Sequence, residues 1–258
     1  MESAVVVRAA RFLAEHAAEP IRLADVADHV GYSPFHLARG FQRSVGVPPG
    51  RFLAAHRFQL AKRLLLDHDD RVIDVCHASG FTAPGTFAWR FTALVGTSPT
   101  EFRRLPHTLA GSPPRPVVVP GSGGPAADLV CGRIELTEAA SQLLGPSPSV
   151  YVGLFPRRSA RGSPVAGALL AGPGEFFLPR VPRGTFWLLA SALARSAAYD
   201  VQLVPPQTVA GTLEQPVRSC ASGRTLRRDL LLDVLPEWST PVLVALPWLA
   251  CPSAQDRR

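Results

Sequence analysis

The sequence is poor in cysteine and in long apolar runs, and each shortage argues against a class of protein. Its four cysteines lie far apart with no CxxC spacing, which disfavours a zinc knuckle or a disulfide framework and fits a reduced cytoplasm. No stretch approaches the roughly 18 apolar residues that a membrane-spanning helix needs. The N-terminus, Met1-Glu2-Ser3, lacks the basic region and apolar core of a signal peptide. A soluble cytoplasmic protein without a membrane partner is therefore expected.

Lysine is also nearly missing, although the chain is basic. Lys62 is the single lysine, so arginine supplies the rest of the positive charge, and the formal net charge is +7. An excess of this sign favours a polyanion as partner over an acidic protein. The 258 residues, 47% of them hydrophobic, are enough for two domains of ordinary size with packed cores.

The first part of the chain, residues 1–105, carries apolar positions at helical spacing and predicts an all-α domain. Proline at the first position of a helix and glycine just beyond its end mark several boundaries. Seven helices are expected, at residues 4–18, 23–30, 34–44, 49–66, 72–79, 84–95 and 99–105.

The rest of the chain follows a different pattern. Residues 106–128 are dense in Pro, Gly and Ser and predict an extended interdomain linker. Beyond them, short β-rich runs separated by Gly and Pro at intervals of about ten residues predict a mainly-β sandwich domain over residues 129–250. The runs are "VCGRIEL", "SVYVGLF", "GEFFLPRV", "GTFWLLASAL", "YDVQLV", "RDLLLDV" and "PVLVALPWL".

One small unit occurs twice in the α-helical part. The stretch "SPFHLARGFQRSVGVPPGRF" at residues 33–52 aligns with part of "GFTAPGTFAWRFTALVGTSPTEFRR" at residues 80–104. In each copy, a short helix, a glycine turn and a second helix beginning with proline follow one another. The aligned pairs are Pro34 and Pro84, Leu37 and Phe87, Ala38 and Ala88, Phe41 and Phe91, Gly46 and Gly96, Pro49 and Pro99, and Phe52 and Phe102.

This arrangement is typical of a helix-turn-helix motif, whose second helix packs by one side and presents the other to a major groove. The groove is wide enough for a helix, and its base edges carry a distinct donor and acceptor pattern. The helix expected at residues 49–66 joins the copies and would extend roughly 27 Å. It could therefore hold two recognition helices about one DNA turn, ~34 Å, apart. Linked sites also raise affinity through effective concentration.

Residues 23–104 closely resemble the DNA-binding domain of the AraC/XylS family of bacterial transcription regulators. The resemblance is carried by "LADVADHVGYSPFHLARGFQRSVGVPPGRF", "HRFQLAKRLLL" and "VIDVCHASGFTAPGTFAWRFTALVGTSPTEFR". In that family the third and sixth helices enter adjacent major grooves. The resemblance thus implies a sequence-specific transcription regulator that binds double-stranded operator or promoter DNA. It implies base contacts by Phe35, His36, Ala38, Arg39, Pro84, Gly85, Thr86, Trp89 and Arg90, and phosphate contacts by Ser33, Arg43, Arg90, Thr100 and Arg103.

Within these sets, Arg39 is the strongest candidate base reader, because arginine can bond a guanine bidentately. Two features depart from the family's pattern. Gly40 stands inside the third helix where a larger side chain is usual. The sixth helix has Pro84, Gly85 and Trp89 where longer polar side chains are common. We therefore expect the sixth helix to contribute more shape and phosphate contact than hydrogen bonding to bases.

The β-rich part resembles transthyretin-like or carboxypeptidase-regulatory-like sandwiches through Gly174-Glu175-Phe176, Val181-Pro182-Arg183-Gly184 and Phe186. The resemblance implies an interaction module that pairs protomers or recruits a partner, which is favoured over the sensing of a small effector. A homodimer, RNA polymerase and an unidentified effector are accordingly candidate partners. A GyrI-like small-molecule-binding domain or an uncharacterised catalytic domain in this part remains an alternative.

No enzyme is expected from the motifs. Cys131, Cys220 and Cys251 lack the Pro-Cys-His-Arg setting of alkyl-transfer domains that join this DNA-binding unit in some proteins, and GxSxG, HExxH and phosphate-loop patterns do not occur. His56 has no acidic residue at ligand spacing. Neither a metal nor another cofactor is therefore expected.

Overall fold

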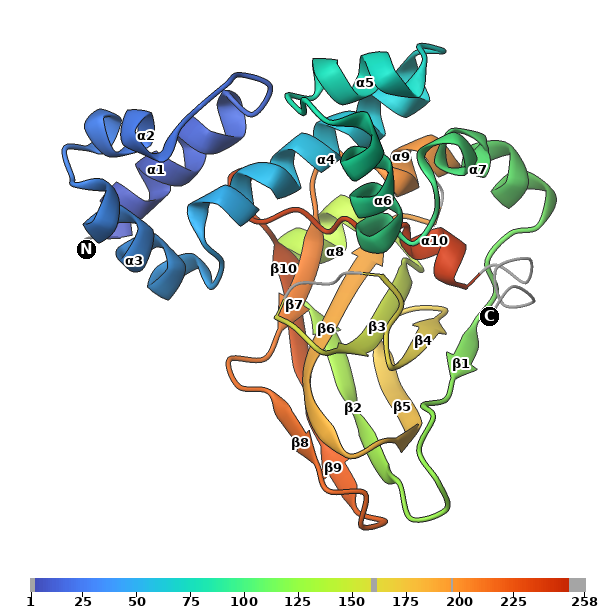
Figure 1. Ribbon diagram of the computed structural model, residues 1–258. Helices are drawn as coiled ribbons and strands as arrows, with labels where there is room; N and C mark the ends of the chain where they lie inside the picture. Colours follow the sequence, from blue (N-terminus) through green and yellow to red (C-terminus); the bar gives the residue numbers. More distant parts are fainter. Residues whose placement is uncertain (1–2, 159–161, 196, 251–258) are drawn as a thin grey trace. The chain divides into compact units, whose positions relative to one another are not determined.

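The computed structural model describes residues 3–158, 162–195 and 197–250 (Figure 1). The chain forms two compact units, each assembled from more than one stretch of sequence. The described residues of the first unit are 3–92, 97–103 and 236–243, and those of the second are 93–96, 104–235 and 244–250, apart from the gaps. This division differs from the expected one at residue 105, because residues 93–96 join the second unit and residues 236–243 join the first.

The seven helices expected before the β-rich part are confirmed. Local signals set several of their ends: Pro34 and Pro49 begin helices, and glycines with a positive φ directly follow three of the seven. The helices are α1 (Ser3–Glu15), α2 (Leu23–Val30), α3 (Pro34–Val45), α4 (Pro49–Asp67), α5 (Val72–Ala78), α6 (Pro84–Val95) and α7 (Pro99–Gly111).

The core of the first unit gathers small and branched side chains of α1 and α2 around the aromatic residues of α3 and α4. Leu37, Phe41 and Phe52 are fully buried within it. Trp238, from the segment 236–243, packs against the same core. Arg57 of α4 adds polar contacts. Its guanidinium donates hydrogen bonds of 2.8 Å to the carbonyl of Ala17 and 2.7 Å to that of Glu19.

The second unit contains a sheet of ten strands. Its main path runs β1-β4-β3-β6-β7-β10-β2-β5, while β8 pairs with β6 and β9 pairs with β2. Most pairings are antiparallel, but β2 lies parallel to both β10 and β9. The strands are β1 (Val117–Val119), β2 (Asp128–Leu136), β3 (Ser149–Phe155), β4 (Ala166–Leu170), β5 (Gly174–Val181), β6 (Gly184–Leu193), β7 (Val209–Thr212), β8 (Val217–Ser219), β9 (Thr225–Arg227) and β10 (Leu230–Val234).

A mainly-β domain is thus confirmed, whereas its description as a sandwich of two sheets is not. The strand path is continuous, because β10 pairs with β7 on one side and with β2 on the other. The sheet also curls, since β1 and β4, at one end of the path, contact β5 at the other. One apolar core from these strands includes the fully buried Phe176 and Leu188. The short helices of this unit are α8 (Glu138–Leu144), α9 (Tyr199–Leu203) and α10 (Leu246–Leu249).

Much of the segment expected as an extended linker, residues 106–128, has regular structure or fixed hydrogen bonds. Helix α7 passes through Pro106 and ends at Gly111, because Leu105 and Leu109 continue its buried stripe. Further on, β1 pairs with β4 in the sheet. The N–H groups of Gly121 and Gly123 donate to the carbonyls of Pro179 and Arg180. The segment rich in proline and glycine therefore follows the sheet and is not an extended linker.

Two of the seven runs expected as strands are not strands. "YDVQLV" forms α9, which buries Gln202 and Leu203 and is tied by the Gln202 amide donating to the Ala197 carbonyl at 2.7 Å. "PVLVALPWL" has no strand, and its second half is α10. Pro241 and Pro247 lack the N–H groups that a ladder needs, which explains why a buried apolar run does not join the sheet.

A buried carboxylate holds the loop between β8 and β9. Asp128 accepts hydrogen bonds from the hydroxyl of Ser219 and from the backbone N–H groups of Cys220, Ser222 and Arg224, at 2.8–3.0 Å. These bonds, with that of Arg224 the strongest influence, hold the pKa of Asp128 far below its usual value although desolvation opposes them. The aspartate therefore stays ionised and fixes the loop.

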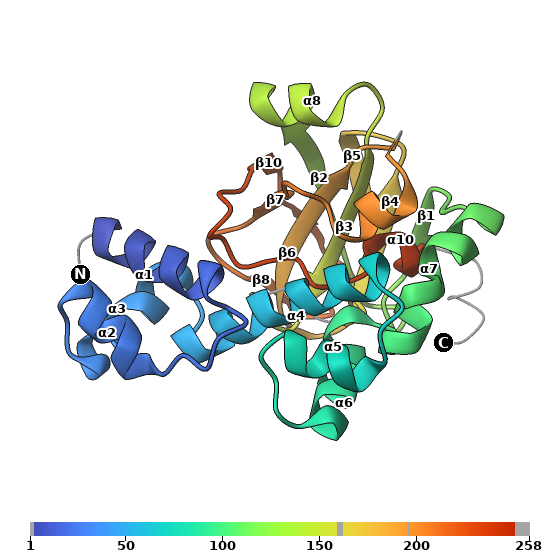
Figure 2. The same ribbon diagram turned by 90° about the horizontal axis from the view of Figure 1, so that it is seen from above.

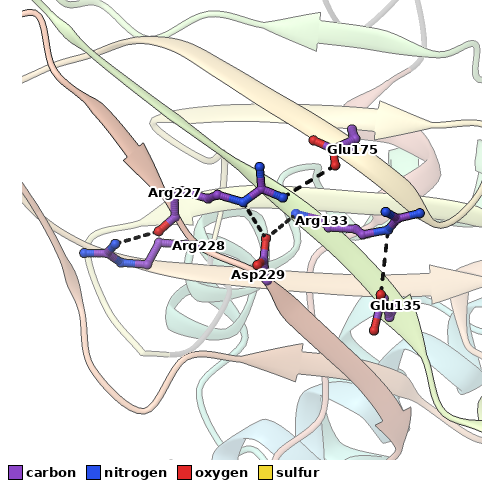
Figure 3. A network of polar contacts seen from close by, with 6 residues as sticks. All are labelled: Arg133, Glu135, Glu175, Arg227, Arg228 and Asp229. Atoms are coloured by element: carbon purple, nitrogen blue, oxygen red, sulfur yellow. Dashed lines mark hydrogen bonds and ion pairs between the residues drawn. The ribbon is translucent and has the colours of Figure 1, made fainter.

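A network of charged side chains covers part of the exposed face of β2, β5 and β9 (Figure 3). Arg227 pairs with Glu175 at 3.6 Å and with Asp229 at 3.5 Å, and Arg133 pairs with Glu135 at 3.7 Å. The carboxylate of Asp229 also accepts the backbone N–H of Arg133 at 2.8 Å. Exposed pairs of this kind are worth little individually, so the network keeps the face polar and adds little to stability.

Candidate nucleic-acid interface

The two copies of the repeated unit have the same turn between their helices. Gly31 follows α2 with a φ of 74°, and the N–H of Tyr32 donates to the carbonyl of Ala27 at 2.9 Å. In the second copy Gly80 has a φ of 82°, and the N–H of Phe81 donates to the carbonyl of Cys76 at 3.0 Å. Both are left-handed glycine turns closed by a bond that spans five residues. The repetition seen in the sequence is therefore a repetition of backbone structure.

Each copy also fixes its second helix by an equivalent aromatic pair. Phe41 of α3 meets Phe52 of α4 edge to face, with ring centroids 5.3 Å apart and planes at 79°. Phe91 of α6 meets Phe102 of α7 at 5.6 Å and 78°. All four rings are fully buried. The inner faces of α3 and α6 are thus held in the same way, which leaves equivalent outer faces exposed.

Helix α4 carries core residues of both copies. With 19 residues it is about 28 Å long at 1.5 Å per residue, and it lies between α3 and the pair α5–α6 (Figure 2). Phe52, near its start, packs on α3. Phe58, in its middle, stacks on Phe87 at 5.7 Å and meets Phe91 at 6.2 Å, both in α6. One rigid helix therefore connects the two recognition helices.

The outer face of α3 presents polar and aromatic side chains. Phe35 is 69% exposed, Arg39 and Arg43 are exposed, and Ala38 is half-buried. Among the described residues no hydrogen bond or ion pair engages either arginine. His36 lies on the first turn, where its ring contacts the hydroxyl of Ser33 at 2.8 Å. Every residue expected to contact bases from this helix lies on one accessible face or at its border.

Ser33 has a structural task at the start of α3. Its hydroxyl accepts the backbone N–H of His36 at 3.4 Å and so caps the helix. The hydroxyl remains exposed and can also meet a phosphate. Serine is preferred at this position because its hydroxyl can satisfy a backbone N–H at the start of the helix.

The outer face of α6 is mostly apolar or uncharged. Gly85 and Thr86 are exposed, Pro84 is half-buried, and Trp89 is 71% exposed. Arg90 points the other way: its guanidinium lies 5.9 Å from the ring centroid of Phe58, in the distance range of a cation–π contact. Arg90 is half-buried in this position, and its contact with bases and phosphates remains a prediction.

The two remaining phosphate candidates differ. Thr100 is exposed in the first turn of α7. Arg103 instead braces α7 against the end of α4, donating to the carbonyl of Leu65 at 3.2 Å, to the carboxylate of Asp69 at 3.3 Å and to the carbonyl of Asp70. These bonds engage the guanidinium of Arg103, and its contact with a phosphate remains a prediction.

Sequence reasoning missed the buried cation Lys62. Its side chain is 1% exposed, and its Nζ lies 5.7 Å from the ring centroid of Phe102. Burial, and to a lesser degree the charge of Arg63, lowers the pKa of Lys62 to about 7. The helical spacing of Phe58, Lys62 and Leu65, four and then three residues apart, is the signal that places the lysine on the buried face.

Other kinds of site receive no support from the described residues. No helix in this part of the chain is long and apolar enough to cross a membrane. Over the same residues, no group of three or more His, Cys, Asp and Glu side chains is arranged to hold a metal ion.

The similarity to known proteins concerns the repeated unit. Residues 26–105 match the family described as "Helix-turn-helix domain". The chain is 36% identical over 83 residues to the HTH-type transcriptional activator AarP of Providencia stuartii, covering 32% of this chain and 62% of that protein. It is 37% identical over 100 residues to the probable thc operon regulatory protein of Rhodococcus erythropolis, covering 38% of this chain and 30% of that protein. The chain thus spans less than two thirds of the length of either relative.

Among solved structures, a probable AraC family transcriptional regulator from Rhodopseudomonas palustris is similar, with 27% identity and a TM-score of 0.38, covering 40% of this chain and 97% of that one. The resemblance of the α-helical part to an AraC-type helix-turn-helix domain is confirmed by the family match and by the named relatives.

Proposed function

From the premise that residues 26–105 match a helix-turn-helix domain and resemble the AraC type, we propose that this protein is a sequence-specific DNA-binding regulator of transcription. Helices α3 and α6 insert into successive major grooves of one duplex. The observation that carries the proposal is the structural repetition: two glycine turns and two equivalent aromatic pairs expose the outer faces of both second helices from a single rigid α4. A chain built in this way obtains from one copy the two-site grip that simpler regulators obtain by dimerising.

In the first groove, Arg39 bonds a guanine through its guanidinium. Phe35, His36 and Ala38 border the same base pairs. The exposed Arg43 and the hydroxyl of Ser33 meet phosphates and set the register without reading sequence.

In the second groove, Pro84, Gly85, Thr86 and Trp89 form the contact surface of α6. Thr100 supplies a phosphate contact at the start of α7. Arg90 and Arg103 support this surface from within, through the contacts with Phe58 and with the end of α4. Helix α6 therefore contacts the bases with few charged groups.

The second unit serves protein interaction in this proposal, either by pairing two copies of the chain or by contacting RNA polymerase. Effector sensing is the second candidate role. It is favoured by a hollow of about 550 Å³ lined by Gln215, Pro216, Arg218 and Arg228, because two arginines suit an acidic small molecule. The protein acts in the cytoplasm on chromosomal DNA, and no catalytic step is part of the proposal.

The test uses the full chain, with DNA sites enriched from a random duplex pool and then footprinted. We expect protection of two major grooves about 10 base pairs apart on one face of the duplex. Arg39→Ala should weaken binding to the selected site by ~1–3 kcal/mol, or roughly 5–150-fold, and relax preference at one guanine.

Arg133→Ala is the charge-matched control. Arg133 is exposed on β2 of the second unit, so its removal lowers the net charge equally without touching α3 and should leave the selected site preferred. Failure of the full chain to prefer any sequence over random competitor at moderate salt would refute the proposed function.

A further inference from the structure

Trp89 is the most exposed of the large hydrophobic side chains of the first unit, at 71%, and it lies in the middle of α6. Single exposed apolar residues are common on protein surfaces and need no explanation by themselves. This one has an equivalent in the other copy of the unit. The repeat aligns Trp89 with Arg39, and Phe91 with Phe41, at identical spacing.

The equivalence extends to three dimensions. Because Phe41 and Phe91 lie in edge-to-face pairs of nearly the same distance and angle, α3 and α6 are rotated alike about their axes relative to the helix that follows each. The side chains two residues earlier, Arg39 and Trp89, therefore leave their helices in the same direction. If Arg39 reaches base edges from α3, then Trp89 reaches them from α6.

The side chains at this position of α6 can make only a few kinds of contact with a base. An indole offers one N–H donor, no acceptor and a large apolar surface. The neighbouring Arg90 is directed toward Phe58, and the other exposed residues nearby, Gly85 and Thr86, carry no charge. In the major groove the apolar group on a base edge is the C5-methyl of thymine, which the apolar side chains of groove-binding proteins contact.

We propose that Trp89 is a specificity-determining residue that reads the C5-methyl group of a thymine in the half-site occupied by α6. The inference rests on the proposed function and specifies which chemical group of a base α6 contacts in the second groove. The two half-sites then differ in kind. The first is read through a charged hydrogen bond of Arg39 to guanine, and the second through apolar contact with a methyl group.

The experiment removes that methyl group alone. In a duplex carrying the selected site, each thymine is replaced in turn by deoxyuridine, which pairs identically but lacks the C5-methyl, and the affinity of the full chain is measured by fluorescence anisotropy. We expect one position in the half-site of α6 to lose about fivefold, or ~1 kcal/mol, and the other thymines of that half-site to change less.

Two variants connect this loss to Trp89. Trp89→Ala should bind the thymine and deoxyuridine duplexes equally at that position. Phe35→Ala removes an aromatic side chain of similar exposure, 69%, from α3 and should keep the difference. Both residues are solvent-exposed, and circular dichroism verifies that the variants are folded.

The possible failures are distinguishable. Selective DNA binding without any methyl dependence in this half-site, or a methyl dependence that survives in Trp89→Ala, would overturn the inference and leave the proposed function standing. A chain that selects no DNA sequence would overturn both.

Discussion

Single residues of α4 place polar atoms inside the first unit. His56 and Gln59 each bury one side-chain atom without a hydrogen-bond partner among the described residues, and Lys62 is buried beside the ring of Phe102. Burying such groups costs stability unless they are satisfied. The linking helix therefore does not have the most stable composition available to it, and its stability should depend on pH.

His56 allows a prediction with a definite sign. Burial lowers its pKa from 6.5 to about 4, although a backbone hydrogen bond to Ser239 opposes the change. Between these two values the unfolded chain binds a proton that the folded chain does not, so the stabilisation is present above pH 6.5 and is lost as the pH falls toward 4. His56→Met should remove on the order of 2 kcal/mol of this acid sensitivity.

The measurement is the free energy of unfolding by denaturant at pH 7.5, 6, 5 and 4.5. His107→Gln, which changes an exposed histidine of α7, is the control and should keep the slope of the parent protein. Parallel pH profiles for the parent and His56→Met would contradict the assignment.

At the scale of the elements, the two glycine turns look alike along the backbone but differ in their surroundings. A Cβ atom at Gly31 would meet nothing within 4 Å, whereas one at Gly80 would lie 2.8 Å from the carbonyl oxygen of Ala18 and 3.0 Å from that of Ala17. A glycine with a positive φ thus stands in an open turn in the first copy. In the second copy the equivalent glycine also lies close to the backbone of residues 17 and 18.

Gly31→Ala and Gly80→Ala form a matched pair of substitutions. Both force a residue with a Cβ into the left-handed region, which costs ~1–2 kcal/mol. Gly80→Ala should cost at least about 2 kcal/mol more, because backbone oxygens cannot move aside as a flexible side chain can. Urea unfolding measures the free energy of unfolding of the two variants. Equal losses would show that a Cβ atom at residue 80 does not clash with the backbone oxygens.

The elements also show what the sequence could and could not predict. The helix ends at Pro34, Gly46 and Pro84 were predictable because proline and glycine act locally. The inward directions of Arg90 and Arg103 were not, because they depend on Phe58 and on the end of α4, which only the fold brings near. Likewise "YDVQLV" was expected as a strand and is a helix, since a short apolar run does not distinguish the two.

At the scale of the whole molecule, the first unit depends on residues from the far end of the chain. Trp238 packs against the core built by α1 to α4 and lies in the segment 236–243, which belongs to the first unit. The domain division expected from composition, at residues 105 and 129, could not predict this, because packing between distant segments leaves no local signal.

Trp238→Ala should destabilise the first unit by roughly 2–4 kcal/mol, as expected when a large, partly buried aromatic is removed. Hydrogen exchange followed by mass spectrometry should show the faster exchange in α1 to α4. Trp187→Ala, in β6 of the second unit, is the control and should leave exchange in these helices unchanged. Unaltered exchange in α1 to α4 of the Trp238 variant would show that the segment contributes little.

The placement of Trp238 has a consequence for the order of events at the ribosome. A nascent chain that has already exposed helices α1 to α4 still lacks the indole of Trp238, which packs against their core. At 5–20 residues per second, translation of the intervening β-rich stretch takes on the order of ten seconds. During that interval the partly finished unit is open to chaperones and proteases, and it reaches its full stability only after Trp238 has been made.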